Sequence, residues 1–134
     1  MNQVNPTIAI VDDYDNHRRL VEMELTDAGY KVISAFDIKG AIQKFEDGGI
    51  HALVIDPGCD GEILKHRDEI KRMYDKIPFA LIFYGNNKNP HLSEFRSIRP
   101  LGEVTKTGDL STLIDELRLS IEQVNSIRIQ QHKS

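Results

Sequence analysis

Three acids and one lysine stand directly after short apolar segments of the chain, where strands are expected to end. These residues are Asp12, Asp13, Asp56 and Lys106. If the segments are parallel strands of one sheet, their carboxyl ends meet at a single edge and bring these side chains together. Clustered carboxylates repel one another, and a hard divalent cation is the simplest group that neutralises them. The set therefore predicts a Mg²⁺ site that suits phosphoryl transfer, with Asp56 as the nucleophile and Lys106 as a cation beside the phosphoryl group.

Five apolar segments predict the strands that position these side chains. They cover residues 7–11, 30–35, 52–55, 79–84 and 101–105. The third segment has no polar alternation, which is typical of a strand that is covered on both faces. Pro57 and Gly58 follow Asp56 and end that strand just where the acid emerges.

Apolar residues at helical spacing predict five helices between and after these strands. The first is capped by Asp15 or Asn16, turns Leu20, Val21, Leu25 and Ala28 inward, and ends at Gly29; the others cover residues 38–45, 63–73, 89–95 and 110–124. Alternating strands and helices require right-handed crossovers, so we expect an α/β domain with a doubly wound parallel sheet. One domain should span residues 1–134, with its core at about 7–124 and flexible ends at 1–6 and 130–134. Ile127 and Ile129 are expected to lie in a frayed end, or otherwise in a dimer contact or a connection to an output domain.

Composition narrows the class of protein. The 134 residues are 40% hydrophobic, which is enough for a core without disulfides. A formal net charge of −4, with scattered Lys and Arg, argues against direct binding to nucleic acid. The single cysteine, Cys59, excludes an internal disulfide and is expected to be structural, and no apolar run is long enough for a membrane span. These features favour a cytoplasmic protein that does not contact a membrane.

The arrangement of Asp12-Asp13, Asp56 and Lys106 resembles the receiver domain of two-component response regulators. The resemblance implies a flavodoxin-like five-stranded sheet in the order 2-1-3-4-5. It also implies that the acid pair and the Gly58 carbonyl hold Mg²⁺, that Asp56 accepts a phosphoryl group, and that Lys106 contacts this group. The donor would be a histidine kinase or a phosphotransfer protein.

By the same resemblance, the chain is expected to be a signalling protein rather than an enzyme, although it would assist its own phosphorylation and dephosphorylation. It is expected to be a stand-alone receiver, because these residues contain no output domain. It would signal through a downstream protein or a homodimer. The expected contact face comprises the fourth helix, the fifth strand and the fifth helix, at about residues 92–117.

The residues that transmit the signal in this family are altered here. The family places a small Thr or Ser hydroxyl at the end of the fourth strand, whereas this chain has Phe83 or, with a one-residue shift, Tyr84. Glu103 takes the place of an aromatic residue on the fifth strand, and Lys106 is followed by Thr107 instead of proline. A pseudo-receiver, which binds partners without phosphorylation, is the alternative function. The chain could also be a fragment of a longer regulator.

Other ligand-binding classes fit the sequence less well. Asp15-Asn-His17 resembles the start of a cobalamin-binding signature, but Leu20 stands where that signature has glycine. Gly58 replaces the second acid of haloacid-dehalogenase-like phosphatases. No Ser/Thr/Gly-rich phosphate loop follows the first strand, which disfavours a flavodoxin-like cofactor site.

Overall fold

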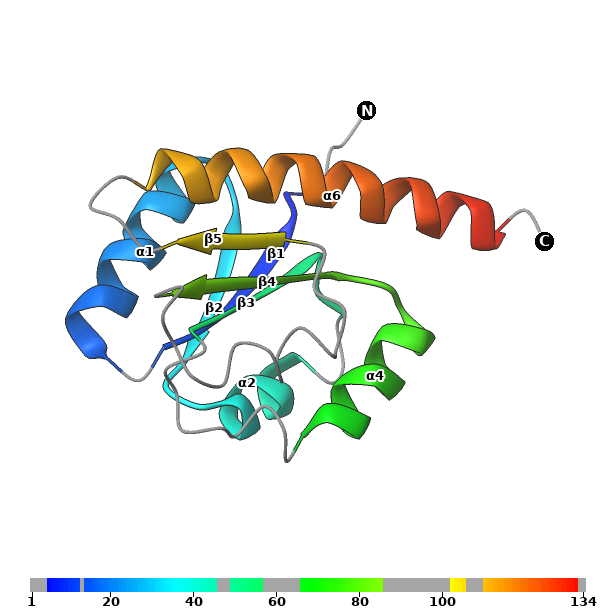
Figure 1. Ribbon diagram of the computed structural model, residues 1–134, viewed down its shortest axis with the longest axis horizontal. Coiled ribbons are helices and arrows are strands. Elements are labelled where there is room, and N and C mark those ends of the chain that lie inside the picture. Colours follow the sequence, from blue (N-terminus) through cyan, green and yellow to red (C-terminus); the bar gives the residue numbers. More distant parts are fainter. Residues whose placement is uncertain are drawn as a thin grey trace.

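The computed structural model describes residues 5–12, 14–45, 49–56, 66–85, 102–105 and 110–132. Strands and helices alternate from residue 7 to residue 85, and a further strand and a helix follow in the later described ranges (Figure 1). The elements are β1 (Thr7–Val11), α1 (Asp15–Asp27), β2 (Lys31–Ala35), α2 (Ile38–Phe45), β3 (Ala52–Ile55), α4 (Arg67–Lys76), β4 (Ala80–Gly85), β5 (Gly102–Thr105) and α6 (Ser111–His132). Four of the five expected helices are thus observed, and the expected helix at 89–95 lies outside the described residues.

The five strands form one sheet in the order β2-β1-β3-β4-β5. Every neighbouring pair is parallel. The order reverses beside β1, so that the chain winds first in one direction and then in the other. The predicted doubly wound sheet and its strand order are therefore confirmed.

Two apolar clusters cover the two faces of the sheet, because successive side chains of a strand point to opposite sides. In β1, Ala9 and Val11 belong to the cluster under α2 and α4, whereas Ile8 and Ile10 belong to the cluster under α1 and α6. Figure 1 shows α2 and α4 below the sheet and α6 above it. The continuous apolar runs therefore reflect burial on both faces, as predicted.

The first helix differs from its prediction at the start and along its inward stripe. Tyr14, and neither Asp15 nor Asn16, occupies the N-cap position. Val21 and Leu25 are buried, but Leu20 is 49% exposed, and Ala28 is also exposed. The face of the helix that contacts the sheet is narrower than the set of apolar residues at helical spacing. Leu20, one position before Val21, therefore points away from the sheet. Gly29 ends the helix with φ of 100°, as its position predicted.

The last helix continues through His132, so the prediction of a frayed end after Val124 was wrong. Arg128 explains the extension, because its guanidinium donates to the carbonyl of Pro78 at 2.8 Å and to that of Ile50 at 2.6 Å. These carbonyls precede β4 and β3, so Arg128 ties the end of α6 to the amino edge of the sheet. Among the helices of the described residues, none is both long and apolar enough to cross a membrane.

Replacement of Phe79 by alanine is expected to lower the free energy of unfolding by about 3–5 kcal/mol, because it leaves a cavity in the core. Phe79 is 2% exposed and meets Tyr74 edge to face, with ring centroids 5.7 Å apart. Phe36→Ala is the matched control: Phe36 is 65% exposed, and its loss should change stability by less than about 0.5 kcal/mol. Urea unfolding followed by circular dichroism measures both, and equal effects would contradict the assigned core.

Stability is expected to decline as pH falls below about 6.5, in part because of His51. The Nδ1 atom of His51 accepts a hydrogen bond from the Thr7 amide at 3.1 Å. Burial, and secondarily the charge of Arg128, lower the pKa of His51. The unfolded chain therefore binds this proton at a higher pH than the folded chain does. The resulting stabilisation is complete above the unfolded pKa and is lost as pH falls toward the folded pKa.

The measurement is urea unfolding at intervals between about pH 7.5 and 5, which brackets the ordinary histidine pKa. His51→Gln supplies an amide oxygen as acceptor and does not titrate, so its stability should fall less steeply with acid. The other histidines are common to both proteins, so the difference between the two profiles isolates His51. Identical pH profiles would show that His51 contributes nothing to the acid dependence.

Candidate functional site

The pairing of β1 with β3 brings Asp12 and Asp56 to the same edge of the sheet. Val11 is paired with Ile55 in the parallel register, and the Asp56 amide donates to the Val11 carbonyl at 3.0 Å. The two acids are the next residues along these strands, so they leave the sheet side by side at its carboxyl end. Asp12 is 3% exposed, and Asp56 is half-buried. The structure thus brings together two of the four residues that the sequence selected.

Asp12 is held by the segment that enters α1 and by the first turns of this helix. Its Oδ1 accepts from the Tyr14 amide at 2.9 Å, and its Oδ2 lies 2.6 Å from Nδ1 of His17. Its carbonyl accepts from Arg18 at 2.9 Å. An ionised carboxylate can only accept hydrogen bonds, so Nδ1 of His17 carries the proton when Asp12 is charged. The buried acid is therefore oriented by three donors on one short segment.

His17 is a site residue that the sequence analysis missed. In the sequence, His17 belongs only to a poorly matched start of a cobalamin-binding signature. Its spacing from Asp12 was the available signal, since a residue in the first turns of a helix that follows a strand can face the end of that strand. The hydrogen bond to Asp12 assigns His17 to the same edge as the acids.

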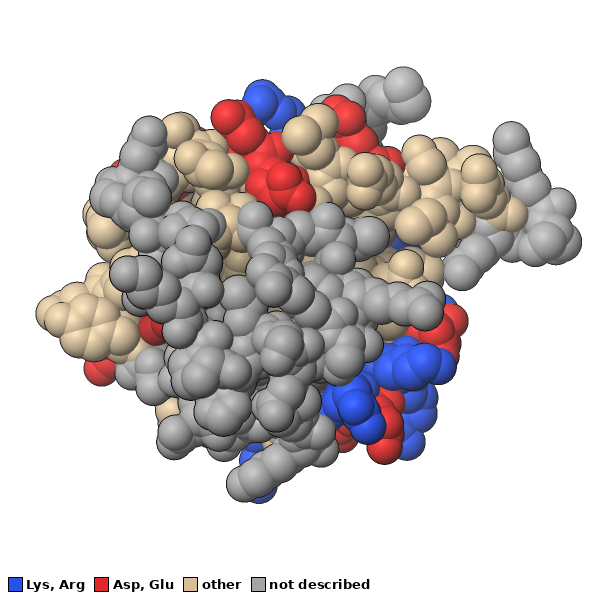
Figure 2. Space-filling model, viewed as in Figure 1, with Lys and Arg blue, Asp and Glu red and all other residues tan. Residues whose placement is uncertain are grey.

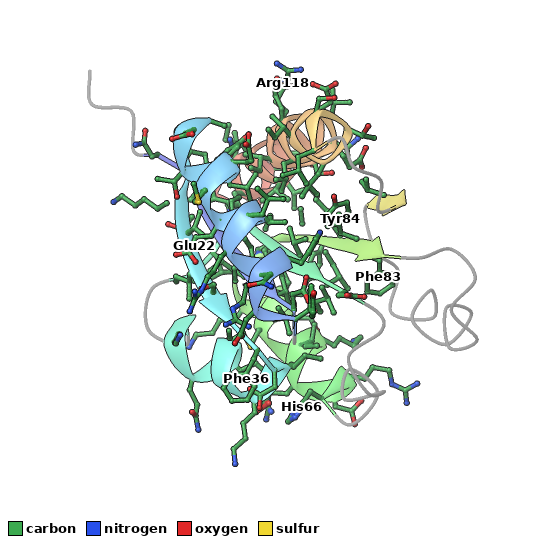
Figure 3. The ribbon with its side chains drawn as sticks, turned by 90° about the vertical axis from the view of Figure 1, so that its left-hand side faces the viewer. Glu22, Phe36, His66, Phe83, Tyr84 and Arg118 are labelled. Carbon is green, nitrogen blue, oxygen red and sulfur yellow. The ribbon has the colours of Figure 1, made fainter. Side chains whose placement is uncertain are left out.

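Phe83 and Tyr84 stand at the end of β4, next to β3, and both are buried. Phe83 is paired with Ile55, so Tyr84 is level with Asp56. The exposed fractions are 2% for Phe83 and 3% for Tyr84. Phe83 belongs to the cluster under α2 and α4, and Tyr84 to the cluster under α1 and α6 (Figure 3). Two large side chains thus fill opposite faces of the sheet behind the acids.

Tyr84 also contacts the segment that holds Asp12. Its ring packs against the ring of His17 with centroids 5.7 Å apart and planes inclined by 32°. The described site is therefore continuous from Asp12 through His17 to β4.

Several predicted site residues lie outside the described residues. These are Asp13, Gly58 and Lys106. Glu103 is placed by its backbone in β5, where it is paired with Phe83. Within the described ranges, no group of three or more His, Cys, Asp or Glu residues is arranged to hold a metal ion.

The two acids that are described nevertheless fit a magnesium ion by their chemistry. Mg²⁺ prefers hard oxygen ligands and usually keeps several waters, so one or two carboxylates are sufficient protein ligands. Asp12 and Asp56 supply such carboxylates from adjacent strand ends.

Charges of both signs are interspersed on the surface near α4. Figure 2 shows Lys and Arg next to Asp and Glu over this helix, at the lower right. Lys71 and Asp75 form one such pair at 3.5 Å. This helix therefore lacks the uniformly basic surface that a nucleic-acid interface requires.

Comparisons with known proteins agree on the fold. No family model matches the sequence, and no curated protein matches it. Among solved structures, the signal receiver domain of a LuxO repressor protein from Vibrio parahaemolyticus has a TM-score of 0.75 at 17% identity, over 94% of this chain and 97% of that one. The chemotaxis response regulator CheY4 of Vibrio cholerae has a TM-score of 0.71 at 21% identity, over 87% of this chain and 99% of that one.

A third similar structure is that of a ligand complex. The response regulator TrrA of Thermotoga maritima, in complex with Mg²⁺-BeF, has a TM-score of 0.69 at 24% identity, over 86% of this chain and 98% of that one. Identities this low establish the fold alone. The chain therefore has the fold of response regulator receiver domains.

Replacement of Arg18 by methionine is expected to cost about 1–2 kcal/mol of stability, because the backbone carbonyl of buried Asp12 loses a charged donor. Arg18 also pairs with Asp15, three residues earlier, at 2.5 Å. Arg118→Met is the control: Arg118 pairs with Asp115 at the same spacing and 2.8 Å, but both side chains are 64% exposed.

The control substitution should change stability by less than about 0.5 kcal/mol, since exposed ion pairs contribute little. Urea unfolding of the two variants beside the parent protein makes the comparison. A loss of equal size in both variants would show that the bond from Arg18 to the Asp12 carbonyl has no special role.

Proposed function

We propose that this chain is a receiver domain that accepts a phosphoryl group on Asp56 in two-component signalling. The observation that carries the proposal is the position of Asp12 and Asp56, which leave adjacent strands side by side at the carboxyl edge of a receiver-fold sheet. Ligands of doubly wound sheets lie at this edge, beside the point where the strand order reverses. In this sheet the reversal falls at β1 and β3.

In the proposed reaction, an oxygen of Asp56 attacks the phosphorus of a phosphohistidine on the partner protein. The bond from phosphorus to the histidine nitrogen breaks, its electron pair leaves with the imidazole, and the new bond joins phosphorus to the Asp56 oxygen. Asp12, Asp13 and the Gly58 carbonyl, together with Asp56, are the proposed holders of Mg²⁺. When bound, this ion neutralises charge on the transferring group. Lys106 is proposed to contact the phosphoryl oxygens.

The proposed partners are a histidine kinase or phosphotransfer protein as donor, and a downstream protein or a second copy of the chain as target. The proposed target face comprises residues 92–117. Of this face, β5 and the first turns of α6 lie within the described residues. Leu113 and Leu117 of α6 are buried against the sheet, so only the outer side of this helix is available to a partner.

Incubation with Mg²⁺ and acetyl phosphate is expected to add the mass of one phosphoryl group to the intact protein. Asp56→Asn should abolish the gain, because an amide oxygen is a poor nucleophile. Asp15→Asn is the control, since Asp15 is an exposed acid on α1 whose described partner is Arg18. Mass spectrometry of the intact protein and its peptides measures the gain and its position. A gain that persists in Asp56→Asn would contradict the assignment of Asp56.

A phosphorylation-independent binding module is the second candidate function. It is favoured by Phe83 and Tyr84, two large buried side chains at the end of β4, where receivers that switch have a small hydroxyl. The same incubation separates the two functions. No mass gain and no Mg²⁺ binding would favour the binding module.

A further inference from the structure

The ring of His17 joins the acid at the end of β1 to the aromatic side chain at the end of β4. On one side, Nδ1 lies 2.6 Å from Oδ2 of Asp12. On the other, the ring packs against Tyr84 at 5.7 Å between centroids. Asp12 and Tyr84 are almost fully buried, at 3% exposure each, whereas the side chain of His17 is 20% exposed. The side chain of His17 is therefore the most exposed of the three.

We propose that His17 is a positioning residue that couples cation binding at Asp12 to the packing of Tyr84. This inference rests on the proposed function, because it takes Asp12 as part of the Mg²⁺ site. Mg²⁺ bound at Asp12 would withdraw electron density from its carboxylate and so would weaken the hydrogen bond from His17 to Oδ2. The His17 ring then shifts against Tyr84, and the end of β4 senses the occupied site.

The contacts of Asp12 determine which of its hydrogen bonds weakens when a cation binds. Oδ1 accepts from the backbone amide of Tyr14, and the Asp12 carbonyl accepts from Arg18, so both neighbours belong to the start of α1. The amide of Asp12 also donates to the Ala35 carbonyl of β2 at 3.1 Å. Among these described contacts, the bond of Oδ2 to the rotatable, partly exposed side chain of His17 is the one that can break without moving the backbone. A cation on the Asp12 carboxylate makes its oxygens poorer acceptors, so the effect on the bond from His17 is local.

The position of Tyr84 allows a shift of the His17 ring to affect β5 and the core under α1 and α6. Tyr84 is paired with Val104 of β5 in the parallel register and belongs to the core cluster under α1 and α6. Close-packed interiors have few voids, so displacement of an aromatic ring moves its neighbours. Through this coupling, cation binding changes the packing at the end of β4 although β4 has no small hydroxyl side chain at that position.

The test titrates Mg²⁺ alone into the unphosphorylated protein and has two readouts. Calorimetry gives the affinity, and nuclear magnetic resonance follows the Tyr84 ring protons and the His17 ring nitrogens. In the parent protein, Mg²⁺ should shift the Tyr84 ring signals and change the His17 Nδ1 signal in step with binding. This experiment needs no variant, so it stands even where a substitution impairs folding.

Three variants then separate the two contacts of His17. His17→Phe keeps an aromatic ring against Tyr84 but removes the competing donor, so Mg²⁺ should bind about fivefold more tightly and move Tyr84 less. His17→Ala should abolish the Tyr84 response. His66→Gln is the matched control, because His66, at the N-cap of α4, also bonds an acid, Glu69, at 3.2 Å. The Mg²⁺ affinity and the Tyr84 response of this variant should equal those of the parent.

The outcomes distinguish this inference from the proposed function. Three outcomes each overturn the coupling alone. The first is Mg²⁺ binding without a change in the His17 and Tyr84 signals, and the second is a full Tyr84 response in His17→Ala. The third is an unchanged or weaker Mg²⁺ affinity in His17→Phe. Absence of Mg²⁺ binding in the parent protein overturns both the coupling and the proposed phosphoryl acceptor. If Asp56 is phosphorylated but the Tyr84 signals do not respond to Mg²⁺, the proposed function holds and His17 has no coupling role in it.

Discussion

The backbone pairing of β1 with β3 is the constraint on which the site depends. The hydrogen bond from the Asp56 amide to the Val11 carbonyl extends the ladder one residue beyond the end of β3. A shift of one residue would turn each apolar side chain of β3 toward the other cluster and would move Asp56 relative to Asp12. The register is held because both faces are packed: α2 and α4 cover one face, and α1 and α6 cover the other. The two cores that stabilise the domain therefore also set the separation of its acids.

Holding two acids at one edge creates an electrostatic cost that the surrounding residues offset. Asp12 is buried, yet its carboxylate accepts hydrogen bonds from Tyr14 and His17. Such bonds compensate for lost hydration. The same contacts tie the acid to α1 and, through the His17 ring, to Tyr84. The opposite edge is secured differently, since Arg128 donates to two backbone carbonyls and holds α6 across the ends of β3 and β4.

Most of the fold could be predicted from the chain alone. Unbroken apolar runs such as Ala52–Ile55 indicate buried parallel strands, and glycine at position 29 marks the end of a helix, because both signals act over a few residues. The predictions were wrong where contacts between residues far apart in the sequence determine burial or helix length. Leu20 fits an apolar helical pattern but points outward, since the orientation of α1 on the sheet selects Val21 and Leu25. The extension of α6 to His132 depends on a bond between Arg128 and carbonyls at Ile50 and Pro78, far away in the sequence.

Local periodicity and residue type specify the order of strands and helices, the burial of the sheet and the presence of acids at two strand ends, so these features can be predicted from the chain alone. Tertiary structure decided which groups meet those acids. His17 lies five residues from Asp12, and Tyr84 lies on another strand; only the packing of α1 against the sheet brings the His17 ring between them. The register of β3 with β4 likewise placed Phe83 beside Ile55 and Tyr84 level with Asp56. Spacing along a chain predicts which side chains can reach an edge, whereas contact between them requires the fold.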